Sequence, residues 1–225
     1  MIRIYALVEG QSEESVINNV IAPSLANLQI YLTPTALPTS KGHKGGDVSF
    51  DRLFFNLRNF LNQEKDTYIT TFLDFYKLKT DFPNYNHAMQ HNDIYQKIDA
   101  LENALHLEVI NNLKCRPERF TPNIQPHELE ALFFSDVEKF PNVETRWQAY
   151  LPKLQSVYDE FNTPEHINNS PQTAPSKRLE AILTPDYRKN RHAPLLAKEI
   201  GLHKIESECQ HFHAWLEKIR QLKPL

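Results

Sequence analysis

The chain has 225 residues, 40% of them hydrophobic, and a formal net charge of −3 at pH 7. This length and composition support a globular core and exclude a disordered tail. With so little net charge, the chain as a whole does not attract nucleic acid, so any such contact needs a local basic patch.

Nothing in the sequence indicates export or membrane insertion. No window approaches the apolar length of a membrane span. The only two cysteines, Cys115 and Cys209, lie far apart, and the N-terminus lacks the basic and apolar segments of a signal peptide. We therefore expect a soluble, cytoplasmic protein with no membrane partner.

The first predicted element is a strand over residues 2–8 that ends at Glu9 and Gly10. Gly10 permits a tight reversal, and Ser12 is a good N-cap for the helix that follows. Glu13 then lies in the first helical turn, four residues after Glu9, so both carboxylates can face one crevice. Two acids held together there repel each other unless a cation or a proton is present.

Strands and helices alternate along the rest of the first 140 residues. The pattern predicts strands at 29–35 and 67–73, helices at 49–61 and 91–113, and an extended segment at 119–126 before a helix that opens at 127–134. This order implies right-handed crossovers and a mostly parallel sheet with helices on both faces. We therefore expect an α/β fold with a four-stranded core over residues 1–140. Residues 141–225 show helices and prolines, and we expect a helical C-terminal extension packed on the core.

Acidic residues follow three of the predicted strands, namely Glu9, Asp74 and Glu128. Because the carboxyl ends of parallel strands meet at one edge of a sheet, we expect these acids to converge. Oxygen ligands suit Mg²⁺ or Mn²⁺, so a metal-assisted phosphodiester reaction is the predicted chemistry. We expect Glu128 to be the fourth member of the site with Glu9, Glu13 and Asp74. Glu130 should turn away, since helix positions two apart diverge.

Two segments supply local positive charge. The loop over residues 38–46 carries Lys41, Lys44 and three of the five glycines, and is compatible with a phosphate cradle or with a solvated loop. Lys177 and Arg178, with basic residues nearby at 188–191, form the densest basic patch of the C-terminal half. We expect Lys177 and Arg178 to fold back toward the acids and grip phosphate, the alternative being a solvated helix face.

Histidine and cysteine give weaker signals. Cys209, His211 and His213 suggest zinc, but alternate positions on a helix face different ways and zinc sites need about four ligands. We expect this helix to pack in the core through Cys209, Phe212, Trp215 and Leu216. His127 beside Glu128 is either a base or a structural hydrogen-bonding residue.

Four segments together carry a family resemblance, and they span nearly the whole chain: Val8-Glu9-Gly10-Gln11-Ser12-Glu13-Glu14, Leu73-Asp74-Phe75-Tyr76, Gln125-Pro126-His127-Glu128-Leu129-Glu130-Ala131-Leu132 and Pro175-Ser176-Lys177-Arg178. The set resembles the Toprim-like family catalogued as domain of unknown function 4276. The first two segments also look like the Toprim domain of topoisomerases, primases and overcoming-lysogenization-defect nucleases. The general Toprim pattern has a second aspartate two residues after the first, where this chain has Tyr76.

The resemblance implies a divalent-metal-dependent nuclease acting on RNA or DNA. Glu9 would then be a metal ligand or general acid/base, Glu13 and Asp74 would be metal ligands, and Glu128 or Glu130 would replace the missing aspartate. It also implies an ABC or SMC-like ATPase as partner and a role in anti-phage defence, with a homodimer left open.

Two alternatives remain at this point. One is a non-catalytic Toprim-like regulatory or binding subunit of an ATPase complex, and the other is a phosphotransfer enzyme or phosphatase on a similar sheet. A regulatory subunit could keep its acids locked in salt bridges, whereas a nuclease needs them converging opposite a basic surface.

Overall fold

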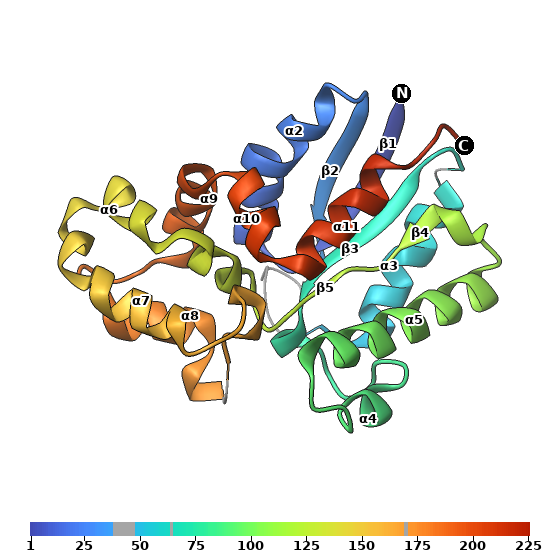
Figure 1. Cartoon of the computed structure of the whole chain (residues 1–225). Coiled ribbons are helices and arrows are strands. Elements are labelled where there is room, and N and C mark those ends of the chain that lie inside the picture. Colours follow the sequence, from blue (N-terminus) through green and yellow to red (C-terminus); the bar gives the residue numbers. More distant parts are fainter. Residues whose placement is uncertain (38–47, 64, 169–170) are drawn as a thin grey trace.

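The computed structural model describes residues 1–37, 48–63, 65–168 and 171–225 (Figure 1). Its centre is a parallel sheet in the order β2-β1-β3-β4, with β5 also pairing with β3. The strands are β1 (Ile2–Val8), β2 (Ile30–Ala36), β3 (Tyr68–Asp74), β4 (Phe120–Thr121) and β5 (Ile124–Gln125). All of them run the same way, so the carboxyl ends of β1, β3 and β5 lie at one edge. There Val8 pairs with Phe72, and Asp74 pairs with Gln125.

Successive side chains of each strand point to opposite faces of the sheet, and both sets are apolar. Helices therefore cover both faces. Leu7, Ile69 and Leu73 pack on one face against α3 (Phe50–Gln63) and α5 (Ile94–Leu113). The opposite face is covered by a second group of elements. It comprises α1 (Gln11–Val16), a π-helix (Ile17–Ile21), α2 (Ala22–Ala26) and α11 (Gln210–Arg220).

The remaining helices are short. They are α4 (Tyr85–Ala88), α6 (Phe140–Val143), α7 (Leu151–Asp159), α8 (Pro175–Ile182), α9 (Lys189–Ile200) and α10 (Leu202–Glu208), with 3₁₀ segments at Phe75–Lys77, Pro117–Arg119, Leu129–Lys139, Thr145–Tyr150, Pro164–His166 and Pro171–Thr173. In Figure 1, α6, α7, α8 and α9 gather to one side of the sheet. The chain then returns through α10, and α11 lies over the sheet alongside β3 (Figure 1).

Helix α11 is part of the main core. The Trp215 ring lies 5.1 Å from the Phe72 ring, centroid to centroid, and Trp215 Nε1 donates a hydrogen bond of 2.9 Å to Thr70 Oγ1. Residues of the C-terminal segment therefore share one apolar cluster with β1 and β3. No helix among the described residues is both long enough and apolar enough to cross a membrane.

The predicted fold class, a mostly parallel α/β sheet flanked by helices, is confirmed. Two local predictions are wrong. Ser12 does not cap the first helix: Gly10 occupies the N-cap position, and Ser12 Oγ donates instead to Asn190 Oδ1 at 2.9 Å. The helix expected to open at residue 127 is a 3₁₀ helix that begins at Leu129.

Candidate functional site

Three acids come together at the carboxyl edge of the sheet, as expected. Glu9 directly follows β1, Glu13 lies in the first turn of α1, and Asp74 is the last residue of β3. All three are buried, with Asp74 only 1% exposed. Glu9 Oε1 accepts a 2.6 Å hydrogen bond from the backbone N–H of Asp74, which ties the ends of the two central strands together.

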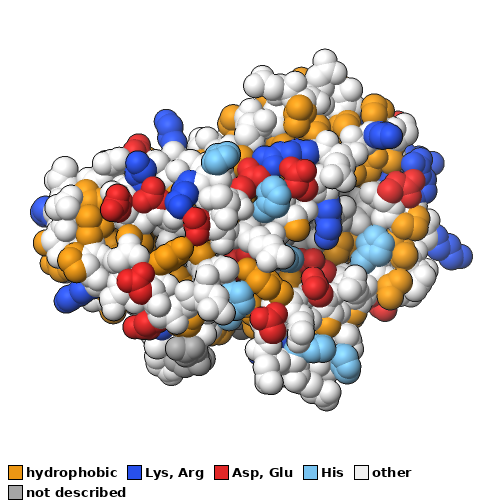
Figure 2. Space-filling view, in the orientation of Figure 1, with side chains coloured by type: hydrophobic (Ala, Val, Ile, Leu, Met, Phe, Trp, Pro, Cys, Tyr) orange, Lys and Arg blue, Asp and Glu red, His pale blue; other side chains and the backbone are white. Residues whose placement is uncertain are grey.

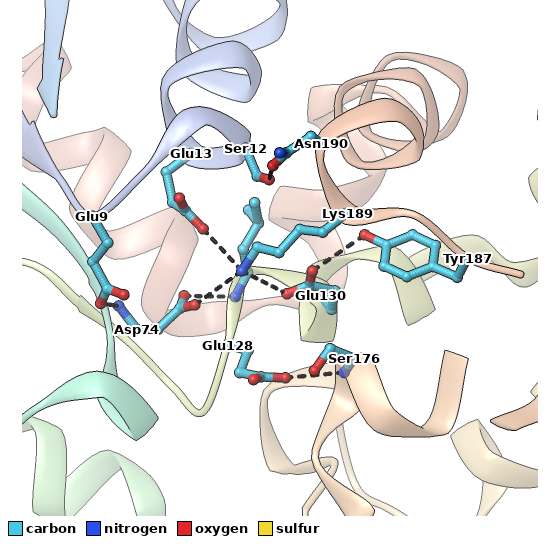
Figure 3. Close-up of polar contacts among 11 residues, drawn as sticks. Glu9, Ser12, Glu13, Asp74, Glu128, Glu130, Ser176, Tyr187, Lys189 and Asn190 are labelled. Carbon is cyan, nitrogen blue, oxygen red and sulfur yellow. Dashed lines mark hydrogen bonds and ion pairs between the residues drawn. The ribbon is translucent and has the colours of Figure 1, made fainter. Parts of the chain in front are cut away.

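Lys189, the first residue of α9, places its ammonium among these acids (Figure 3). Its Nζ lies 3.0 Å from Glu13 Oε1, 3.3 Å from Asp74 Oδ2 and 3.2 Å from Glu130 Oε2. The start of α9 is anchored beside it, because Asn190 accepts a hydrogen bond from Ser12 of α1. Glu13 and Asp74 therefore share one cation, and that cation belongs to the protein itself.

Glu130 belongs to this cluster, so the expectation that it turns away is wrong. Its side chain is fully buried, and the Tyr187 hydroxyl donates to Glu130 Oε1 at 3.2 Å. The physical reason is that residues 128–130 do not form an α-helix. Glu128 is extended (φ −149°, ψ 158°), and the 3₁₀ helix starts only after it.

Glu128 instead lies at the margin of the acids. Its Oε2 accepts a 2.9 Å hydrogen bond from the backbone N–H of Ser176, in the first turn of α8. Between the two glutamates, the Leu129 N–H donates to Asp74 Oδ1 at 2.8 Å, so this segment wraps around Asp74. Figure 3 shows Glu130 facing Lys189 and Glu128 facing Ser176.

Burial and mutual repulsion set the protonation of the cluster. Burial raises the pKa of Asp74 to about 7, with Lys189 opposing the rise and Glu13 adding to it. Burial, followed by the charges of Asp74 and Glu13, also raises the pKa of Glu9 well above its usual value. Burial alone would lower the pKa of Lys189, but the surrounding carboxylates outweigh burial and raise it. The ammonium is therefore charged near pH 7, whereas Glu9 and Asp74 hold their protons to higher pH than free carboxyls do.

The side chains of Lys177 and Arg178 form no hydrogen bond or ion pair with these acids among the described contacts, and their expected grip on phosphate stays a prediction. Lys177 Nζ forms an exposed ion pair with Glu180 at 2.7 Å. Arg178 Nε donates to the Thr173 carbonyl at 2.9 Å, and its guanidinium lies 5.2 Å from the centre of the Phe161 ring. The segment reaches the acidic edge only through its backbone, because Pro175 starts α8 and leaves the next N–H without a helical acceptor.

His127 and Tyr76 lie beside the site and contact each other. Their ring centroids are 5.8 Å apart, and the His127 carbonyl accepts a hydrogen bond from the Tyr76 N–H at 3.1 Å. Burial lowers the pKa of His127 to about 4, so its imidazole is neutral near pH 7. Its Nδ1 lies 3.4 Å from Asn168 Nδ2. These contacts suit a structural hydrogen-bonding residue, and a role as base stays a prediction.

Two further predictions concern the loop lysines and the C-terminal helix. Lys41 and Lys44 lie outside the described residues. The C-terminal prediction is confirmed, since these side chains are buried in the core: Cys209, Phe212, Trp215 and Leu216.

The sequence pattern did not assign Lys189, Tyr187 or Asn190 to the site. Lys189 counted only as one charge of the basic stretch at 188–191. Its partner Asp74 lies 115 residues earlier, and no local periodicity links the two. The sole available signal was a polar cluster at the start of a helix, which is common on solvated surfaces.

The donor set fits a hard divalent cation. Glu9, Glu13, Asp74 and Glu130 offer only carboxylate oxygens, the ligands that Mg²⁺ and Mn²⁺ prefer. Glu130 Oε2 is buried and accepts no hydrogen bond, its contact being the ion pair with Lys189. The oxygens stand 3.0–3.3 Å from Lys189 Nζ, the spacing of ion pairs rather than of metal coordination.

Comparison with known proteins assigns the family. Among solved structures, the chain is similar to the C-terminal region of the OLD protein of Xanthomonas campestris pv. campestris, with 18% identity and a TM-score of 0.46 over 98% of this chain and 95% of that one. No curated protein matches the chain. Residues 8–220, from the end of β1 to the last turn of α11, match the family described as Domain of unknown function (DUF4276). The chain therefore belongs to the DUF4276 family.

Proposed function

We propose that the chain is a divalent-metal-dependent nuclease that cleaves phosphodiester bonds in nucleic acid at the carboxyl edge of its sheet. One observation carries the proposal: Glu13, Asp74 and Glu130 are buried at this edge around a single ammonium, and two more buried acids, Glu9 and Glu128, lie beside them. Buried acids at this spacing repel one another unless cations or protons balance them. One lysine does not balance this set, and a divalent cation would take the place of the protons that the raised pKa values of Glu9 and Asp74 favour.

Specific side chains have distinct parts in this proposal. Glu9, Glu13, Asp74 and Glu130 would hold Mg²⁺ or Mn²⁺. When bound, such an ion supplies an activated water and offsets the charge of the phosphate. Lys189 offers an ammonium to the negative charge that develops on the phosphate oxygens. The Glu128 contact with the Ser176 N–H fixes the start of α8 beside the site.

The face of the molecule drawn in Figure 2 supports local rather than broad contact with a polyanion. Figure 2 shows Lys and Arg side chains interspersed with Asp and Glu on this face rather than gathered in one basic surface. We infer that binding depends on a few charges near the acids, with Lys189 the nearest of those described. A role as anti-phage effector beside an ABC or SMC-like ATPase is part of the proposal and is supported by the family resemblance alone.

A second function is favoured by a specific observation. Lys189 already pairs with Glu13, Asp74 and Glu130, which is the arrangement expected of a non-catalytic regulatory subunit. In that case Lys189 takes the place of a metal permanently, and the acids serve the fold.

Cleavage assays separate the two functions. Purified protein is incubated with single- and double-stranded DNA, tRNA and unstructured RNA, with Mg²⁺, Mn²⁺ or a chelator. We expect metal-dependent cleavage of at least one substrate by the parent and by the matched control Arg178→Ala, whose guanidinium contacts Thr173 and Phe161. Asp74→Asn should reduce the rate by at least about a hundredfold while the protein stays folded.

Two negative results would contradict the proposed nuclease site. Equal cleavage by Asp74→Asn and the parent contradicts the assignment of this site. No cleavage of any substrate, together with no binding of Mn²⁺ measured by calorimetry, favours the regulatory subunit.

A further inference from the structure

Three aromatic side chains lie directly beside the acidic site. Phe75 and Tyr76 follow Asp74, the last residue of β3, and His127 precedes Glu128. The ring centroid of His127 lies 5.8 Å from that of Tyr76 and 6.3 Å from that of Phe75. Phe75 and Tyr76 are half-buried. These three rings therefore form an aromatic cluster that is partly open to solvent next to the acids.

The backbone holds this aromatic cluster in a fixed arrangement. His127 has a φ of 60°, in the left-handed region that residues with a β-carbon seldom adopt. Its carbonyl accepts the hydrogen bond from the Tyr76 N–H, and its Nδ1 lies 3.4 Å from Asn168 Nδ2. Backbone strain of this kind persists only where the surroundings enforce it, and it is concentrated at sites that bind ligands. The rings are therefore in position before any ligand binds.

A lysine without an acidic partner adjoins the aromatic cluster. Burial first, and then the charges of His166 and Lys97, lower the pKa of His127, so Lys97 of α5 lies close to the imidazole. His166 pairs with Asp93 at 3.4 Å. No carboxylate of the described residues forms an ion pair with Lys97. Glu128 also adjoins the cluster, but its Oε2 is already engaged by the Ser176 N–H. Lys97 is thus a cation available to an anionic ligand.

A single strand of nucleic acid offers a partner for each of these groups. Its unpaired bases can stack on an aromatic ring, and this stacking needs no particular base because every base has a π face. Its phosphates can contact a lysine. The bases of an intact duplex are stacked on one another, and a ring reaches one only if it is flipped out. The cluster therefore favours a single strand over a duplex.

We propose that Tyr76, supported by Phe75 and His127, stacks on an unpaired base of a single-stranded nucleic acid while Lys97 contacts a phosphate of the same strand. This inference rests on the proposed function, because the acids beside the cluster are assigned there to phosphodiester cleavage. It names the substrate class of that site as single-stranded DNA or RNA, and it places a base next to the phosphate that is cut.

Oligonucleotide binding in the presence of a chelator tests the stacking contact. Fluorescence anisotropy with the full chain compares oligothymidylate with an abasic strand of the same length. The parent should bind oligothymidylate more tightly by about fivefold or more. Tyr76→Leu should lose this preference, whereas Tyr76→Phe keeps the ring and should bind like the parent. Tyr31→Leu is the matched control, because Tyr31 is 49% exposed near the amino end of β2, at the opposite edge of the sheet from the acids.

Lys97→Met tests the phosphate contact separately. This variant should weaken binding of both strands alike, and the slope of log affinity against log salt should flatten by about 0.7 for one lost phosphate contact on a single strand. Lys198→Met is the matched control, since Lys198 is exposed in the last turn of α9. The same assay with oligouridylate distinguishes RNA from DNA as the bound strand.

Three results would overturn the proposal. Equal affinity of the parent for oligothymidylate and the abasic strand does so without requiring any variant to fold. A preference for oligothymidylate that persists in Tyr76→Leu also does so, as does tighter binding of a duplex than of either single strand. Because the chelator prevents metal-dependent cleavage, these results are independent of catalysis. A chain that stacks on bases but cleaves no substrate would contradict the proposed function alone.

Discussion

Lys189 controls the charge balance of the acidic site at the scale of single residues. It is the partner of three buried carboxylates, two of them 1% exposed or less. Removing one partner of a buried ion pair leaves an uncompensated charge in a poorly solvated place. The site therefore depends on a residue that lies on a different element from every acid it pairs with.

The first prediction concerns Lys189→Met. We expect a loss of about 3 kcal/mol in the free energy of unfolding, at the low end for a buried ion pair, because the Lys189 side chain is 33% exposed. This corresponds to a fall in Tm of about 6–12 °C. Mn²⁺ should restore part of the loss by binding the freed acids. Lys177→Met removes only an exposed pair and should change Tm little. A Lys189→Met protein as stable as the parent would contradict this role.

The second prediction concerns pH and Asp74. The carboxyl has a pKa of about 7 in the folded chain and an ordinary low value when unfolded. Between these values the folded state holds more protons, so the contribution of Asp74 to stability falls as the pH rises from about 4 to 7. Asp74→Asn removes this penalty. The Tm of the variant relative to the parent should therefore increase from pH 5 to pH 8, and a constant difference would show that Asp74 titrates normally.

Single residues also show what a sequence can reveal about a site. Glu9 and Asp74 were predictable because a buried strand that stops at an acid places the acid at the sheet edge. The sequence prediction placed Glu128 in the site and turned Glu130 away, which is the reverse of the structure. It assumed regular helical geometry where the backbone is extended and then 3₁₀. Lys189 was not predictable, since tertiary packing alone brings it to Asp74.

At the scale of elements, the N-terminus of α11 is capped by the carboxylate of Glu165, which lies in a distant segment of the chain. Glu165 is fully buried, and its two oxygens accept hydrogen bonds from the N–H groups of His211 and Phe212 and from the Tyr95 hydroxyl. These N–H groups have no acceptor within the helix. Glu165 therefore fixes the start of α11, the helix that covers the sheet. No capping motif in the local sequence predicts this contact.

The third prediction tests this contact with Glu165→Gln. The amide keeps one acceptor oxygen but turns an NH₂ group toward a donor, which should cost about 1–3 kcal/mol of unfolding free energy. Amide hydrogen exchange should quicken in the first turn of α11 more than in α5. Glu160→Gln is the matched control, because the Glu160 side chain is 55% exposed. Equal exchange in both variants would mean that Glu165 does not hold the helix.

The predicted ends of the helices and strands agreed with the structure more closely than the predicted division of the chain into elements did. The strand expected at 67–73 is β3 at Tyr68–Asp74, and the helix expected at 91–113 is α5 at Ile94–Leu113. The segment at 119–126 instead divides into β4 and β5. Pro122 lies between them and has no N–H to continue the ladder.

At the scale of the whole molecule, one apolar cluster joins β1 and β3 to helices from the C-terminal segment. Ala6, Val8 and Phe72 of the sheet share it with Leu196 and Trp215. The sequence predicted helices after residue 140 that pack on the core, but it did not show that α11 covers β1 and β3. Docking of this kind depends on long-range packing, which periodicity does not encode.

The fourth prediction follows from this shared cluster. A chain of residues 1–140 alone should fail to fold cooperatively, because it exposes the apolar face that α11 covers. In the full chain, fluorescence should report on both tryptophans, Trp147 and Trp215, which lie in the C-terminal segment. Circular dichroism reports on the whole chain, and the two probes should give coincident unfolding curves, as one cooperative unit requires. Separate transitions, or a truncated chain that unfolds cooperatively, would instead establish residues 1–140 as an independent domain.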